Sequence, residues 1–174
     1  MDIRFVLPEL RRMDDLKCEA IAVPLFVDER PLRGPGGLLD WRLSGMLSQL
    51  ILRGRVSGNA QETVLIPARP KLPFEKLFLF GLGPMESFDG TLFDATVDRM
   101  LDTLTAVRVR ASVIVLPGRA VERISAVEAM ERFLEVAGRH PEHDEITLVE
   151  SAEAQKAMGP IVEKARRRAR AAFT

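Results

Sequence analysis

The sequence predicts an α/β protein, a three-layer α/β/α sandwich around a mixed sheet. Two kinds of segment lead to this prediction. Short apolar runs such as residues 20–26 (AIAVPLF) and 112–117 (SVIVLP) are typical of strands that are buried on both faces. Longer stretches with apolar residues at helical spacing lie between such runs. Strands buried on both faces need helices on both sides of the sheet, which gives three layers.

The first half of the chain is expected to hold one helix among several strands. Apolar residues recur at helical spacing from Leu39 to Leu50, and Gly54 follows as the expected C-terminal cap. Two prolines in the stretch ARPKLPFE exclude regular structure there. The expected strands cover residues 2–7, 20–26, 63–67 and 76–82.

The second half alternates helices with strands. Residues 92–107 are expected to form an amphipathic helix whose aspartates face outward. Ser125 and Glu128 have the spacing of a capping box, which predicts a helix that ends near Gly138. A last helix follows, in which Gly159-Pro160 marks either a kink or a late start. The remaining expected strands cover residues 112–117 and 145–150.

The composition is that of a soluble, cytoplasmic protein. With 174 residues, the chain is expected to form a single domain, 1–174, with its own core. Its 25 basic and 25 acidic residues give no argument for nucleic acid or a membrane as partner. One cysteine excludes an internal disulfide, and we expect neither a signal peptide nor a membrane-spanning helix.

Glycine-containing turns follow three of the expected strands and form the candidate ligand site. In open α/β sheets, ligands bind at the carboxyl ends of strands. Glycine lets backbone N–H groups approach a ligand, and a helix N-terminus adds partial positive charge. Trp41 follows the first turn; it lines the pocket, joins a partner interface or, as we expect, anchors its helix on the sheet. The candidate ligand-binding residues are Gly34, Gly36, Gly37, Gly81, Gly83, Gly118 and Trp41.

The alternative is that these glycines only shape turns, and the residues by themselves favour it. Neither the dinucleotide-binding fingerprint G-x-G-x-x-G nor the Walker sequence follows any expected strand. Asp40 is expected in the first turn of the helix after Gly37, where its charge would repel a phosphate. The stretch 34–37 is therefore interpreted either as a phosphate-binding loop or as the entrance to a helix.

Other reactive side chains predict no catalytic or metal site. His140 and His143 lie in RHPEHDE, which we interpret as a surface turn because further metal ligands are missing. Cys18 lacks an activating neighbour and is expected in the core. The C-terminal EKARRRARAAF is interpreted as a solvated helix end, the alternative being a patch for nucleic acid or an acidic partner. We predict no metal ion and no cofactor.

Two long stretches resemble the N-terminal domain of cytosolic leucine aminopeptidases. They read EAIAVPLFVDERPLRGPGGLLDWRLSGMLSQLI and ETVLIPARPKLPFEKLFLFGLGP, and the resemblance extends over residues 5–147. It implies a macro-domain-like fold, in agreement with the element order. In that family a C-terminal domain holds two metal ions through a stretch of the type Asn-Thr-Asp-Ala-Glu-Gly-Arg, which this sequence lacks. We therefore expect no peptidase activity.

The implied fold is shared with macro domains, which bind ADP-ribose. The resemblance places their diphosphate loop at Gly34–Gly37 and their second glycine turn at Gly81–Gly83. Asp14 and Asp15 lie near the position of the adenine-reading aspartate. The family's asparagines are replaced by Pro24-Leu25-Phe26, which argues against ADP-ribose hydrolysis.

Three functions follow as hypotheses. The first is a non-catalytic module that acts in self-assembly, or in regulation by docking on an aminopeptidase-like protein. The alternative is a binder of ADP-ribose or another nucleotide-like molecule through the glycine turns. Residual metallo-aminopeptidase activity is the third and weakest hypothesis, and nucleic acid and membrane are not expected partners.

Overall fold

A mixed sheet forms the middle layer of the protein, as the sequence predicts; the computed structural model describes residues 1–172. The strands are β1 (Asp2–Val6), β2 (Ala20–Leu25), β3 (Thr63–Pro67), β4 (Lys76–Gly81), β5 (Ala111–Ile114) and β6 (Glu145–Val149). They lie in the order β1-β6-β5-β2-β4-β3, and every neighbouring pair is parallel except β3 with β4.

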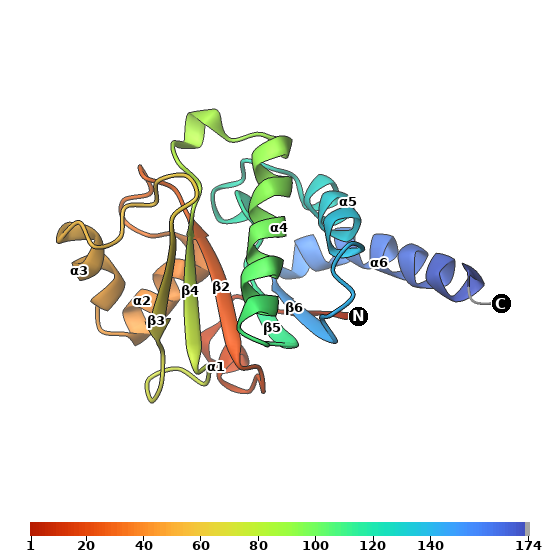
Figure 1. Cartoon of the computed structure of the whole chain (residues 1–174), viewed down its shortest axis with the longest axis horizontal. Helices are drawn as coiled ribbons and strands as arrows, with labels where there is room; N and C mark the ends of the chain where they lie inside the picture. Colours follow the sequence, from red (N-terminus) through yellow and green to blue (C-terminus); the bar gives the residue numbers. More distant parts are fainter. Residues whose placement is uncertain (173–174) are drawn as a thin grey trace.

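Helices cover both faces of the sheet, which confirms the three layers (Figure 1). Ile21, Val23 and Leu25 point to one face and pack with α1 (Leu10–Asp14), α2 (Gly34–Arg42) and α3 (Met46–Leu52). Ala20 and Ala22 point to the other face and pack with α4 (Gly90–Ala106), α5 (Ala126–Ala137) and α6 (Ala152–Ala172). Two short 3₁₀ turns, η1 (Met85–Ser87) and η2 (Arg119–Val121), complete the described elements. Among residues 1–172, no helix is both long and apolar enough to cross a membrane.

Side-chain caps set the starts of α4 and α5. The Asp89 carboxylate accepts a hydrogen bond from the N–H of Leu92 at 2.8 Å, and the Ser125 hydroxyl accepts one from the N–H of Glu128 at 3.1 Å. The expected Ser125 cap is thus confirmed. The Glu128 carboxylate, however, binds Arg132 Nε at 2.9 Å, one turn further along the helix.

The single helix expected over residues 39–50 is wrong, because the structure has two helices there, α2 and α3. Ser44 and Gly45 adopt φ values of 59° and 79°, and this left-handed backbone separates the end of α2 from the start of α3. The buried Asp40 carboxylate then accepts hydrogen bonds from the backbone N–H groups of Leu47 and Ser48 and caps α3. At the other end of α3, Gly54 has a φ of 68° and acts as the cap that the sequence predicts.

The two ends of the chain also differ from the prediction. The short α1 was not expected, and its one buried side chain is Met13. The last helix starts at Ala152, so Gly159-Pro160 does not mark a late start and Pro160 lies inside α6. Met158 and Val162, on either side of this proline, are both buried against the sheet, so packing maintains the helix through the residue that disfavours it.

Candidate functional site

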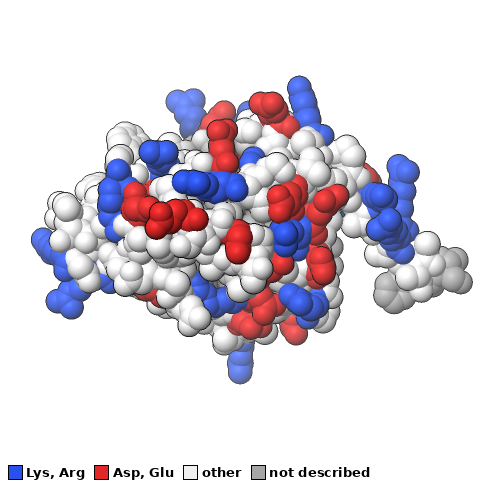
Figure 2. Space-filling model, turned by 90° about the horizontal axis from the view of Figure 1, so that it is seen from above, with Lys and Arg blue, Asp and Glu red and all other residues white. Residues whose placement is uncertain are grey.

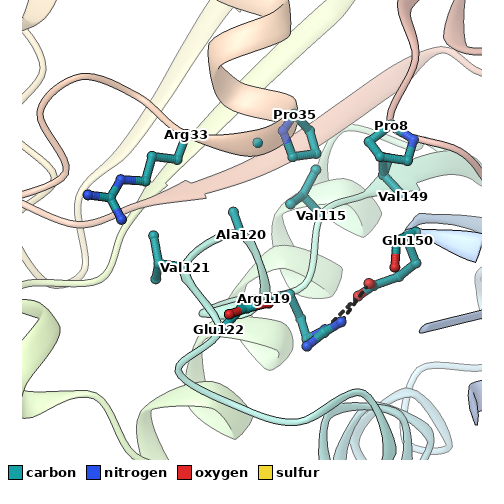
Figure 3. Close-up of a pocket in the computed structure, with 12 residues that line it drawn as sticks. Pro8, Arg33, Pro35, Val115, Arg119, Ala120, Val121, Glu122, Val149 and Glu150 are labelled. Atoms are coloured by element: carbon teal, nitrogen blue, oxygen red, sulfur yellow. Dashed lines mark hydrogen bonds and ion pairs between the residues drawn. The ribbon is translucent and has the colours of Figure 1, made fainter. Parts of the chain in front are cut away.

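The cavity that best fits a functional site lies at the carboxyl ends of the parallel strands (Figure 3). Its volume is about 340 Å³. The chain leaves β2 toward β3 and β4, but it leaves β5 toward β6 on the other side of the sheet. Ligands in open α/β sheets bind at such a point, because the two loops diverge there. The cavity is lined by Pro8, Arg33, Gly34, Pro35, Val115, Arg119, Ala120, Val121, Glu122, Val149, Glu150 and Ser151.

One wall is the N-terminus of α2. The glycine run GPGG is the first turn of this helix, with Arg33 as the N-cap residue and Gly34 at a φ of 55°. A helix start carries partial positive charge, which favours an anion. The chain already places a carboxyl there, because the buried Glu29 side chain accepts a hydrogen bond from the N–H of Arg33. Burial raises the pKa of Glu29 to about 7 against the opposing effect of that bond.

The opposite wall is η2, which contacts α2 closely. A Cβ atom on Gly34 would lie 3.0 Å from the Cβ of Ala120, so only glycine fits without a shift. Figure 3 shows Ala120 and Val121 facing the start of α2 across the cavity. The positive φ and the tight contact together explain the glycine at position 34 without a ligand.

The third side of the cavity is a buried ion pair between η2 and the residue that follows β6. Arg119 Nε and Nη2 donate to the two carboxylate oxygens of Glu150, each at 3.0 Å. Arg119 Nη1 donates to the carbonyl of Ile124 at 2.9 Å. The Glu150 side chain is only 5% exposed. Because all three guanidinium nitrogens of Arg119 already donate to Glu150 or Ile124, the pair contributes no free positive charge to the cavity.

The structure brings only one predicted glycine, Gly34, to the lining of this cavity. Gly36 packs on Val23, and Gly37 lies so close to Leu32 that a Cβ would be 2.7 Å from its carbonyl oxygen. Gly118 precedes η2, where a Cβ would meet the ring of Phe88 at 2.5 Å. At these positions the missing side chain allows close packing, and a ligand role remains a prediction.

The turn after β4 packs against another loop. The N–H of Gly83 donates to the carbonyl of Gly58 at 2.8 Å, and its own carbonyl accepts from the N–H of Val27 at 3.1 Å. A Cβ on Gly81 would lie 1.9 Å from the carbonyl oxygen of Asn59. Gly81 and Gly83 therefore hold the 58–60 loop beside β4, and their predicted role in ligand binding is untested.

Two expectations about α2 are wrong. Trp41 does not anchor the helix on the sheet, because it is 74% exposed while its neighbours Leu39 and Leu43 point into the core. Asp40 lies in the second turn of α2 and its carboxylate caps α3. It therefore gives no argument against an anion at the start of α2.

RHPEHDE forms a turn at the surface between α5 and β6, as expected, but both of its histidines are buried. His140 is 8% and His143 is 1% exposed. His140 Nε2 lies 2.8 Å from Asp98 Oδ1, and His143 Nε2 lies 3.2 Å from the carbonyl oxygen of Leu101, so both rings tie this turn to α4. Burial lowers the pKa of His143, which favours its neutral form. Among the described residues, no group of three or more His, Cys, Asp or Glu side chains is placed to hold a metal ion.

Cys18 and the C-terminal cations lie as expected, with one difference. Cys18 is buried, and burial raises the pKa of its thiol. Arg166 is held against β1, where Nη2 donates to Asp2 Oδ1 at 2.7 Å and to the carbonyl of Ile3 at 2.9 Å. The other cations of this stretch are exposed: Lys164, Arg167, Arg168 and Arg170. Figure 2 shows basic side chains gathered where α6 extends beyond the body.

Four further residues shape this site although no sequence pattern points to them: Glu29, Arg119, Ala120 and Glu150. Arg119 directly follows Gly118 in a turn that was selected, and Glu150 ends an expected strand. These neighbours in the sequence were the only indication, because the contact between Arg119 and Glu150 depends on the order of β5 and β6 in the sheet.

Comparison with known proteins gives one family. The model of the "Cytosol aminopeptidase family, N-terminal domain" matches residues 22–140. A probable cytosol aminopeptidase of Thermosynechococcus vestitus is 30% identical over 118 residues, which are 67% of this chain and 24% of that protein. The chain thus spans about a quarter of that relative's length.

Solved structures show the same fold. A tomato leucine aminopeptidase mutant superposes with a TM-score of 0.59 at 12% identity, covering 91% of this chain and 35% of that one. A Trypanosoma brucei macrodomain in complex with ADP-ribose superposes with a TM-score of 0.69 at 16% identity, covering 92% of this chain and 68% of that one. These likenesses confirm the expected macro-domain-like fold and say nothing of a ligand here.

Proposed function

This chain belongs to the cytosol aminopeptidase family through its N-terminal domain, and on that premise we propose that it is a non-catalytic module acting through protein contacts. Its partner is a second copy of itself or an aminopeptidase-like protein. The family model that matches is that of the N-terminal domain, and the sequence lacks the expected metal-ligand stretch.

The observation that carries this proposal is the exposure of Trp41 on α2, at 74%. A tryptophan left in water is costly, and tryptophan is enriched among the residues that dominate binding at interfaces. Leu52, at the end of the adjoining α3, is 79% exposed, and Leu65 on β3 is 51% exposed. Among residues 1–172, the three most exposed large hydrophobic side chains therefore fall within one stretch of chain, 41–65.

Light scattering coupled to size-exclusion chromatography tests the proposal, with the chain alone and mixed with a full-length cytosol aminopeptidase. We expect an average mass above that of the monomer in at least one of these samples. Trp41→Ser should weaken the association about tenfold or more, since buried tryptophans at interfaces contribute on that scale. Val127→Ser is the matched control, because Val127 is an exposed apolar residue, at 45%, on the distant α5.

The proposal would be refuted if the chain stayed monomeric by itself and also did not bind the aminopeptidase. Trp41→Ser keeps the fold intact because the indole is already in solvent. A loss of association equal to that of Val127→Ser would show that Trp41 has no part in the contact.

Binding of a nucleotide-like molecule is the second candidate, favoured by the position of the cavity. Its 340 Å³ lie beside the start of α2 at the point where the β2 and β5 loops diverge, which is the usual ligand position in such sheets. The cavity is at the small end of the range for ligand sites. Its Arg119 is already paired with Glu150, which weakens the case for a diphosphate.

Calorimetric titration with ADP-ribose and ADP decides this second candidate. Binding should be lost in Gly34→Val, whose side chain would push Ala120 and the start of α2 apart and so distort this wall of the cavity, while Gly159→Ala in α6 meets no neighbour and serves as control. The absence of both heat and a thermal shift at millimolar ligand would exclude it.

A further inference from the structure

The two edges of the sheet differ in how they are protected from pairing with another strand. At the β1 edge, Asp2 and Arg4 carry charges, and Arg166 of α6 donates to the backbone carbonyl of Ile3. Charged side chains and covered backbone groups of this kind prevent strand addition. The other edge, β3, reads TVLIP and has no charge.

The backbone groups of β3 that face away from the sheet follow from its register with β4. Glu62 accepts from the N–H of Gly81, and the N–H of Ala68 donates to Glu75, so residues with even numbers form the hydrogen-bonded pairs with β4. Thr63 and Leu65 consequently direct their N–H and C=O groups outward, and Pro67 directs its C=O outward. Figure 1 shows β3 as the outermost strand beside β4, with α4 lying toward β5 and not over β3.

We propose that β3 pairs with β3 of a second copy of this chain, antiparallel and with Leu65 opposite its own counterpart. This inference rests on the proposed self-association and names its contact. Leu65 and its counterpart would exchange two backbone hydrogen bonds, and each Thr63 N–H would donate to the Pro67 carbonyl of the other copy. Because Pro67 has no N–H, the carbonyl of each Thr63 finds no donor in the other strand, so the pair makes four backbone hydrogen bonds and lacks two. The half-exposed Leu65 side chains would cover each other on one face of the joined sheet.

The charges that flank β3 select a second copy in the antiparallel direction. Residues 63–68 are uncharged, Glu62 precedes them and Arg69 follows them. Antiparallel pairing places Glu62 of one copy near Arg69 of the other at both ends, whereas a parallel pair would place like charges together. The Glu62 carboxylate already accepts hydrogen bonds from Ser57 and Gly58 of its own chain, so the flanking charges favour the direction of pairing without forming a new ion pair. The strand is thus complementary to itself in apolar contact and in the sign of its flanking charges.

Disulfide trapping tests this contact in a Cys18→Ala background, which removes the only native thiol. In a hydrogen-bonded antiparallel pair the opposed Cα atoms are about 5.5 Å apart, which a disulfide can bridge. Leu65→Cys should therefore give a covalent dimer under mild oxidation at high protein concentration. Thr63→Cys, on the same face of the same strand, should not, because its counterpart would lie about 13 Å away.

A second measurement uses the chain without any cysteine introduced. Amide hydrogen exchange at Thr63 and Leu65 should slow as the concentration rises, and Leu65→Lys should abolish both this protection and the dimer. Leu65 is half-exposed and its outward groups make no bond within the sheet, so the variant should remain folded.

The outcomes separate this inference from the proposed function. A dimer that forms without linking at Leu65→Cys, and that Leu65→Lys leaves intact, would overturn the β3 contact while the protein-contact function stands. A chain that is monomeric alone and binds only an aminopeptidase would do the same. Linking at Leu65→Cys together with concentration-dependent protection would support the contact.

Discussion

Glu29 gives a prediction that can be worked through from the structure. Its carboxyl is 4% exposed in the loop between β2 and α2, and burial raises its pKa from 4.5 to about 7. Below about pH 4.5 the group is protonated in both folded and unfolded chains and contributes nothing. As the pH rises to about 7, the unfolded chain loses the proton that the folded chain keeps, so stability falls. The shift corresponds to a penalty of roughly 3 kcal/mol above neutral pH.

The perturbation is Glu29→Gln, which keeps an acceptor for the N–H of Arg33 but has no charge to bury. Urea unfolding of both proteins at about pH 5 and about pH 8 isolates the effect, because all other groups are shared. We expect the stability of Glu29→Gln relative to the wild type to rise by about 2 kcal/mol between these pH values.

The exposed Glu131→Gln on α5 is the control, since an exposed carboxyl pays no desolvation penalty. A Glu29→Gln variant with the same dependence of stability on pH as the wild type would refute the reasoning. So would a variant that loses stability relative to the wild type as the pH rises.

Three further predictions concern stability and activity. Asp40→Ala should lower the free energy of unfolding by about 1–2 kcal/mol, because the first N–H groups of α3 lose their acceptor. Ser48→Ala is the control in the same urea experiment: it loses only the hydroxyl that donates to Asp40, keeps the backbone bonds and should cost less. Glu150→Ala should cost about 3 kcal/mol by leaving Arg119 buried and unpaired, and Arg119→Met with Glu150→Leu should recover most of it; no recovery would contradict this explanation. The chain should release no product from a leucine anilide with added manganese or zinc, and release above the rate of a heated sample would contradict the non-catalytic proposal.

The strands and their order along the chain were predictable because they depend on local pattern. Runs such as AIAVPLF exclude alternation and identify a buried strand before any neighbour is known. The division into α2 and α3 was not predictable from local pattern. It depends on the Asp40 carboxylate, which accepts hydrogen bonds from the backbone N–H groups of Leu47 and Ser48. The burial of His140 and His143 likewise depends on α4, which lies far away in the sequence.

The candidate site was predictable only in part. Glycine turns after strands pointed to the edge of the sheet at which the candidate cavity lies, and Gly34 lines that cavity. The sequence could not separate glycines beside a cavity from glycines that permit close packing, as at Gly81 and Gly118. That distinction requires the strand order, which places η2 and Glu150 beside α2 and moves the turn after β4 away.

The molar mass in solution tests the central claim, that this domain acts through protein contacts, most directly. Light scattering over a wide concentration range, with the chain alone and with a full-length cytosol aminopeptidase, gives that mass. The account predicts a mass that rises above the 19.4 kDa of one chain, and a Trp41→Ser variant whose mass rises less. A mass that stays at 19.4 kDa in every sample would contradict it.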